Sequence, residues 1–90
     1  MITPYIQDPQ DKFDYPFDWT TAIGDDTIQT SQFVADSGFT VESDEILDEG
    51  HTLVWLSGGT VDKRYAVTNH ILTLGGREYS WTIYVLVKEQ

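Results

Sequence analysis

The sequence predicts an all-β protein built as a sandwich of about seven antiparallel strands. Segments rich in β-branched and aromatic residues recur roughly every eight to twelve residues, with turn-forming Gly, Asp and Ser between them. No segment keeps a helical period over three turns. Two sheets that pack face to face would bury the apolar positions of the alternating segments.

The clearest element is a long hairpin in the last third of the chain. Residues 64–73 and 79–87 read as strands on either side of Gly75-Gly76. A two-residue turn would send the two apolar sets to opposite faces, and a one-residue change of register reverses this. We therefore expect a three- or five-residue loop with a bulge. The residues that would then share the inner face are Tyr65, Val67, Asn69, Ile71, Tyr79, Trp81, Ile83 and Val85.

Residues 1–12 are expected to form an extended arm, and residues 13–90 the sandwich domain. Pro4 and Pro9 lack backbone donors and favour an irregular, extended path. Residues 13–19 alternate between aromatic and polar side chains, as a half-buried strand does. Pro16 within that strand predicts that it lies at the edge of a sheet.

The segments between that edge strand and the hairpin are short. Residues 43–50 fit either a short strand or a solvated loop. The remaining expectations, in chain order, are a turn at 20–26 that allows a helical turn at 20–23, a strand at 27–34 broken between Ile28 and Phe33, a turn at 36–38, and strands at 39–41 and 52–57.

Charge and composition exclude several functions. The formal net charge is −10, from fifteen acidic and five basic residues. Duplex nucleic acid and anionic membranes call for a basic face, so neither is an expected partner, whereas a basic protein surface is. The chain has no Cys, which removes disulfides, thiolate metal sites and Cys nucleophiles. Residues 1–20 do not resemble a signal peptide, and no apolar run approaches the length of a membrane span.

Catalytic and metal sites are not predicted. A calcium site is conceivable because six acids cluster in the first third, but their spacing matches no EF-hand loop and turn capping is the better interpretation. Those acids are Asp8, Asp11, Asp14, Asp18, Asp25 and Asp26. His51 and His70 have no convergent partners in the sequence, and no nucleophile elbow is present. We expect no cofactor, no bound metal and no enzymatic activity.

One stretch resembles the E-to-F region of immunoglobulin-like and fibronectin type III sandwiches. It comprises Val54-x-Leu56, Gly58-Gly59 and Tyr65-x-Val67. In those domains a Tyr near the start of strand F bonds to backbone upstream, and Tyr65 matches that Tyr. The resemblance implies an immunoglobulin-like fold with Val54 and Leu56 inward and with Leu53 and Trp55 outward.

Outward apolar side chains are the predicted contact surface, because monomers seldom expose large apolar patches. The alternative is that an added strand or the arm covers them. The predicted partner-binding residues are Tyr5, Ile6, Leu53, Trp55, Leu72, Leu74, Tyr84 and Leu86. The predicted structural residues are Tyr15, Trp19, Tyr65, Gly75, Gly76 and Trp81.

A second resemblance covers nearly the whole chain. The chain is similar to a family of small structural proteins of tailed bacteriophages, fibre–tail adaptors or minor virion proteins. Residues 8–19 read D-P-Q-D-K-F-D-Y-P-F-D-W and residues 24–28 read G-D-D-T-I, which resemble the family pattern D-P-D-x-x-L-D-Y-x-x-D-W, then G-D-T-I, with Phe13 in place of Leu. The family's V-W-L-S-G-G, Y-x-V-T-N and closing R-E-Q correspond to residues 54–59, 65–69 and 88–90, the last of which read K-E-Q. The last strand is more aromatic than is usual in the family, which indicates a different or larger contact surface.

This resemblance implies a non-enzymatic virion protein that acts through protein–protein contacts. Its implied partners are tail, fibre or capsid subunits, and it would be oligomeric in the particle after assembly in the host cytoplasm. Two other functions stay open at this point. One is a capsid decoration protein, and the other is a small carbohydrate- or surface-binding sandwich that uses exposed Trp and Tyr.

Overall fold

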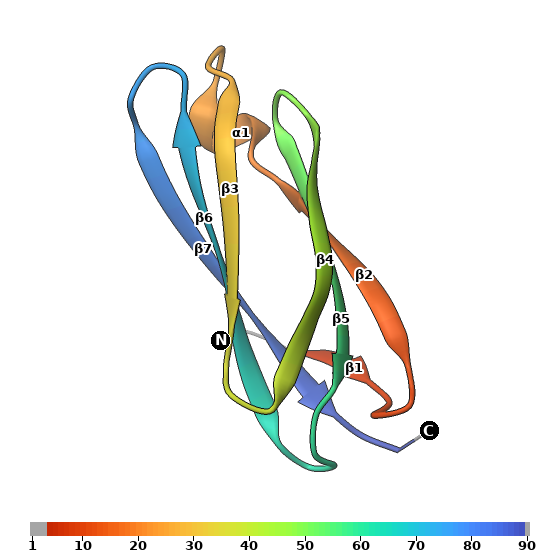
Figure 1. Ribbon diagram of the computed structural model, residues 1–90. Helices are drawn as coiled ribbons and strands as arrows, with labels where there is room; N and C mark the ends of the chain where they lie inside the picture. The colour runs from red at the N-terminus through yellow and green to blue at the C-terminus, as the bar shows by residue number, and fades with distance from the viewer. Residues whose placement is uncertain (1–3, 90) are drawn as a thin grey trace.

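Seven strands and one helical turn make up the part of the chain that the computed structural model describes, residues 4–89 (Figure 1). The elements are β1 Tyr5–Gln7, β2 Lys12–Asp18, α1 Thr20–Ile23, β3 Ile28–Ala35, β4 Phe39–Asp48, β5 His51–Gly58, β6 Arg64–Thr73 and β7 Glu78–Val87. One sheet has the order β1-β7-β6-β3 and the other β2-β5-β4. The two sheets face each other, which confirms the predicted all-β sandwich. The immunoglobulin-like assignment within that class stays a prediction.

The β6–β7 hairpin has the predicted register. Tyr65 pairs with Val85 and Asn69 pairs with Trp81, so the inward sets of both strands share one face. The Thr73 N–H donates to the Arg77 carbonyl at 2.8 Å, which leaves a three-residue loop, residues 74–76. Gly76 in that loop has φ 85°, in the left-handed region that Gly adopts without strain. The odd loop length expected from the apolar pattern is therefore confirmed.

Strand β2 lies at the edge of its sheet, as Pro16 predicted, because it pairs with β5 alone. Tyr15, Phe17 and Trp19 are buried. Phe13 lies at the start of the strand and is 54% exposed, although its ring packs against Tyr15 with centroids 5.5 Å apart. The alternation is therefore confirmed, but the first aromatic is only partly covered.

The central segments follow the sequence pattern closely. The expected helical turn at 20–23 is α1, and a shift of register between Ile28 and Thr30 is the expected break in β3. Of the two alternatives for residues 43–50, the structure has the strand, because β4 continues to Asp48. Its second half is exposed and its pairing with β5 shifts twice, which explains why the sequence resembled a loop.

A buried polar cluster bridges the two sheets. The Trp19 Nε1–H donates to Asn69 Oδ1 at 3.0 Å, and the Thr52 hydroxyl donates to the same oxygen at 2.6 Å. The Asn69 Nδ2 donates to Ser31 Oγ at 2.8 Å and to the Gln32 carbonyl at 3.1 Å. Since Asn69 is fully buried, these bonds replace the water that its amide loses on folding.

Tyr65 makes the upstream backbone contact that the resemblance implied. Its hydroxyl accepts the Thr60 N–H at 2.8 Å. Hydrogen bonding with Thr60, from its side chain first and its backbone N–H second, lowers the pKa of Tyr65. Its ring stacks on Phe39 with centroids 5.1 Å apart. A Cβ at residue 59 would lie 2.6 Å from the Val87 side chain and 3.1 Å from the Tyr65 side chain. Residue 59 is therefore a Gly because the backbone packs closely against these side chains.

The described part of the arm is tied to both sheets. Strand β1 pairs in parallel with β7, Tyr5 opposite Val85, whereas the other strand pairs are antiparallel. Gln7 is buried, and its Nε2 donates to the Leu56 carbonyl at 2.9 Å. The Tyr15 hydroxyl donates to Gln7 Oε1 at 2.8 Å, and burial raises the pKa of Tyr15 to about 12. Residues 1–3 of the expected arm lie outside the described residues.

Replacing Asn69 by Ala should destabilise the protein by about 3 kcal/mol, because the Trp19 N–H and the Thr52 hydroxyl lose their shared acceptor in the core. Urea unfolding followed by tryptophan fluorescence measures this change. Thr68→Val on the outer face of the same strand is the control and should cost less than about 1 kcal/mol. Equal costs for both variants would contradict the role given to the buried cluster.

Tyr65→Phe keeps the ring and removes the hydroxyl, so the Thr60 N–H loses its acceptor. The Tm should fall by roughly 4 to 8 °C, as expected for one such bond in a small domain. Tyr84→Phe on the outer face should shift the Tm by less than about 2 °C. A scanning calorimetry experiment in which Tyr65→Phe melts with the unchanged protein would remove the bond from the stabilising contacts.

Candidate partner-binding surfaces

Several apolar side chains lie together on the outer face of the four-stranded sheet, at the end where β1 joins. Ile6 and Arg64 lie on either side of Leu86, and Tyr84 lies opposite Ala66 in the next row. Ile6 is 57% exposed. The Arg64 guanidinium carbon lies 5.4 Å from the Tyr84 ring centroid, a cation–π contact. We call these five residues the Leu86 patch.

Val34 adds an exposed apolar side chain to the same face, and the sequence analysis missed it. It lies opposite Thr68 on β6 and is 64% exposed. The sequence contains a signal for this outward position. Once the break after Ile28 is placed, Val34 shares the outward positions of β3 with Thr30 and Gln32.

Leu72 and Leu74 do not join the Leu86 patch. Leu72 lies on the same face but between Thr30 and Glu78. Eight residues along β7 separate Glu78 from Leu86, a distance of roughly 26 Å in a strand. Leu74 lies in the β6–β7 loop and is 65% exposed. These two residues form a separate small surface at the loop end.

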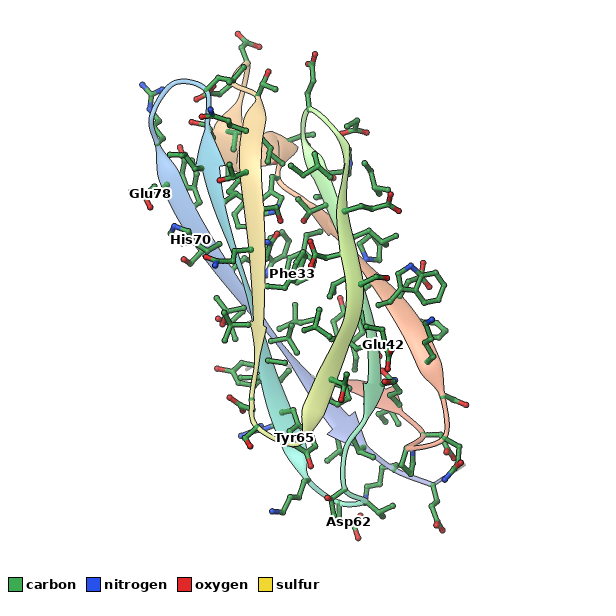
Figure 2. The ribbon with its side chains drawn as sticks, in the orientation of Figure 1. Phe33, Glu42, Asp62, Tyr65, His70 and Glu78 are labelled. Carbon is green, nitrogen blue, oxygen red and sulfur yellow. The ribbon has the colours of Figure 1, made fainter. Side chains whose placement is uncertain are left out.

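A polar row lies between these two surfaces. His70 Nδ1 and Ser80 Oγ are 2.7 Å apart, and His70 Nε2 lies 2.8 Å from Glu78 Oε1. Figure 2 shows His70 and Glu78 close together on the outside of the four-stranded sheet, while Phe33 points between the sheets. The histidine therefore lies on the strand surface with its ring held by two side chains.

The outer face of the three-stranded sheet carries Leu53 and Trp55, as the resemblance implied. Both are half-buried. Pro16 and Glu45 flank Leu53 in the neighbouring strands, and the Lys12 Nζ lies 5.8 Å from the Trp55 ring centroid. This surface is thus more mixed in polarity than the Leu86 patch.

Tyr5 differs from the other predicted contact residues, because it lies on the inner side of its sheet. Its ring packs against Tyr15 with centroids 5.1 Å apart. Trp81, predicted as a structural residue, packs against Phe17 at 5.4 Å and Trp19 at 5.5 Å. Trp81 is nevertheless 42% exposed, an exposure that the sequence pattern did not predict.

Two acids hold His51 at the other end of the three-stranded sheet. Its Nδ1 lies 2.8 Å from Asp48 Oδ1 and its Nε2 lies 3.5 Å from Asp18 Oδ1. The Asp48 hydrogen bond is the main reason why the pKa of His51 is raised. The Thr20 hydroxyl lowers the pKa of Asp18, and the Gly50 N–H lowers that of Asp48. Asp18, His51 and Asp48 lie side by side because of the pairing register of β2, β5 and β4.

Other kinds of site are not found in the described part. Among residues 4–89 no group of His, Asp and Glu is arranged to hold a metal ion, and no cavity opens. In the same residues, the helix present is too short to cross a membrane. The acids that were considered for calcium instead cap turns where contacts are seen, as Asp8 does for the Gln10 N–H.

These features define a small β-sandwich with apolar side chains on the outer faces of both sheets. The chain belongs to the family of the Podophage GP4 fiber-tail adaptor protein gp77, whose model matches residues 7–86. A search of curated proteins finds no match. The family confirms the phage fibre–tail adaptor resemblance seen in the sequence and makes the chain a phage virion component.

Asp48→Asn should lower the pKa of His51 toward the ordinary histidine value, because it removes the charge nearest the ring. A histidine pKa that is raised on folding stabilises the protein below about pH 6.5, and this contribution is lost as the pH rises through the folded-state pKa. An NMR titration of the His51 ring protons measures the shift. Asp44→Asn, on the same strand, is the control; an unchanged midpoint in Asp48→Asn would contradict the assignment.

Proposed function

We propose that this chain is a non-enzymatic structural protein that joins fibre and tail components of the virion by protein–protein contacts. The observation that carries the proposal is the family match over residues 7–86. The description of that family names an adaptor between a fibre and a tail. An adaptor holds two partners at once, and this function calls for more than one contact surface and for no catalytic group.

The Leu86 patch is the best candidate for the first contact. It combines aliphatic side chains with a Tyr and an Arg, and aromatic residues and Arg are enriched at the centres of protein interfaces. The Arg64–Tyr84 pair is preformed, so little side-chain freedom is lost when a partner covers it. Polar side chains beyond the patch, such as His70 and Ser80, would form the polar rim of this interface.

The surface around Leu53 and Trp55 is the candidate for the second contact. It lies on the opposite sheet, so a partner bound there does not compete with one on the Leu86 patch. The Leu72 and Leu74 surface at the loop end is smaller and could extend either contact. The acidic chain favours basic partner surfaces, with charge complementarity acting mainly on the association rate.

The remaining parts of the proposal follow from this function. The protein assembles in the host cytoplasm and then acts within the virion, as one of several copies. Its partners are tail and fibre subunits, with no nucleic acid, membrane or cofactor involved. The net charge of −10 agrees with the absence of nucleic acid from this set.

Purified tail and fibre proteins of the same virus, mixed with this chain one at a time, test the proposal. Light scattering should show a stable complex with at least one tail and one fibre protein. Tyr84→Ala should weaken one of these complexes at least tenfold, which is about 1.4 kcal/mol, as expected for an interface hot spot. Gln32→Ala, on the same face outside the patch, should leave the affinity unchanged.

Two results would contradict the adaptor function, and a third would contradict only the assigned contact surface. Binding to a capsid subunit alone would favour a decoration protein. A monomer that ignores every virion protein but melts at a higher temperature with calcium or a glycan would favour a recognition module. Equal losses of affinity in Tyr84→Ala and Gln32→Ala would remove the Leu86 patch from the contact while leaving the adaptor function standing.

A further inference from the structure

Among the described residues, strand β7 has one edge that is paired over only part of its length. Along its ten residues it pairs with β6, but on the other side β1 covers only Val85–Val87. Within residues 4–89 no strand pairs with β7 on that side between residues 78 and 84. We call this stretch the open edge.

The peptide groups at the open edge can be assigned from the bonds next to it. The Val87 N–H donates to the Lys63 carbonyl on the β6 side, and the Lys88 N–H donates to the Gln7 carbonyl on the β1 side. Successive peptide groups of a strand point to opposite neighbours, and the β6–β7 register has no shift. The backbone N–H and C=O groups of Ser80 and Thr82 therefore point outward along the open edge.

The open edge lacks the features that usually protect a strand from pairing. Edge strands carry charges, Pro or bulges for this purpose. Strand β2 has Pro16 between Asp14 and Asp18, β4 has acids and two register shifts, and β3 has a bulge. By contrast, the open edge has a single charge, Glu78 at its end, and residues 79–84 are Tyr-Ser-Trp-Thr-Ile-Tyr, without a charge or a Pro.

An apolar side chain lies directly behind these backbone groups. Trp81 faces the inner side of the sheet, packs on Phe17 and Trp19, and yet is 42% exposed. Among residues 4–89, β1 pairs with β7 only from Val85 onward, so no described strand lies along the seam between β7 and β2 beside Trp81. A strand placed along the open edge would continue the position of β1 and cover this indole.

We propose that the open edge binds an extended strand from a tail or fibre protein, which pairs with residues 79–84 of β7 above β1. This inference rests on the proposed adaptor function for the identity of the partner. Backbone pairing supplies affinity in such strand additions, and alternate side chains supply specificity. One side of the added strand would be apolar, to cover Trp81.

The negative charges near the open edge limit which partner segments can dock there. Asp18 and Glu78 lie in the strands that border this half of the seam, and both are exposed. The whole chain carries ten more negative than positive charges. We therefore expect a segment of about six residues with an alternating apolar pattern and Lys or Arg at its ends, because like charges would oppose docking.

Amide hydrogen exchange, read residue by residue by NMR, tests the strand addition. In the protein alone, the Ser80 and Thr82 amides should exchange fast, and those of Trp81 and Ile83, which face β6, should exchange slowly. Adding the purified tail or fibre protein that binds should slow Ser80 and Thr82 at least tenfold. The alternation of fast and slow amides distinguishes strand pairing from simple burial of a surface.

A pair of variants at one position gives an independent test. Thr82→Pro removes an outward N–H, and Pro is tolerated where that group faces away from the sheet. It should weaken binding at least tenfold. Thr82→Val is the matched control, because it also removes the hydroxyl that lies 2.8 Å from Thr68 Oγ1 but keeps the N–H. Its affinity should stay within about twofold of the unchanged protein, since a single part-buried hydroxyl pair contributes little.

The outcomes separate this inference from the function on which it rests. A partner that binds while Ser80 and Thr82 keep exchanging fast overturns the strand addition and leaves the adaptor function standing. Protection that rises with the concentration of this chain alone assigns the open edge to a second copy and also overturns the proposal. If no tail or fibre protein binds, both fail. Should Thr82→Pro not fold, the exchange experiment decides alone.

Discussion

The sandwich depends on one buried amide. Asn69 accepts hydrogen bonds from side chains of the β2–β5 sheet region and donates to β3, so its four bonds connect both layers. An apolar residue at position 69 would leave several polar groups without partners, because the Trp19 Nε1–H and the Thr52 hydroxyl both donate to the Asn69 oxygen. The bridge also fixes the relative slide of the sheets, because hydrogen bonds, unlike apolar contacts, tolerate little displacement. The distance between the outer faces of the two sheets therefore depends on this bridge.

The edges and faces of this frame divide the protein into protected and available parts. Acids and a Pro protect β2 and β4, and the same acids give the chain its large negative charge. The four-stranded sheet carries fewer charges on β7, where apolar and aromatic side chains reach the surface. A protein that acts through a few selected contacts, as proposed above, gains from this division. Charge keeps most edges apart, while a few neutral regions remain for specific contacts.

Much of this architecture could be predicted because strand alternation is a local signal. The hairpin register followed from one demand, that Asn69 and Trp81 share a face with their neighbours, and β2 was placed at an edge by Pro16 alone. The exposure of Trp81 could not be predicted, since it depends on how far a strand distant in sequence extends along β7. The acids around His51 were missed for a similar reason. Asp18, His51 and Asp48 meet only through the register of three strands, and no spacing in the sequence records it.

The pairing of β1 with β7 sets an order of events during synthesis. These strands are far apart in the sequence, so the parallel ladder between them forms only after residue 87 has left the ribosome. Contacts between such distant segments are slow to form, because a long loop must close first. Until then Val85–Val87 have no neighbour on the side that β1 covers in the folded protein. A nascent chain of this protein therefore completes its sheet last at the very strand that we assign to partner recognition.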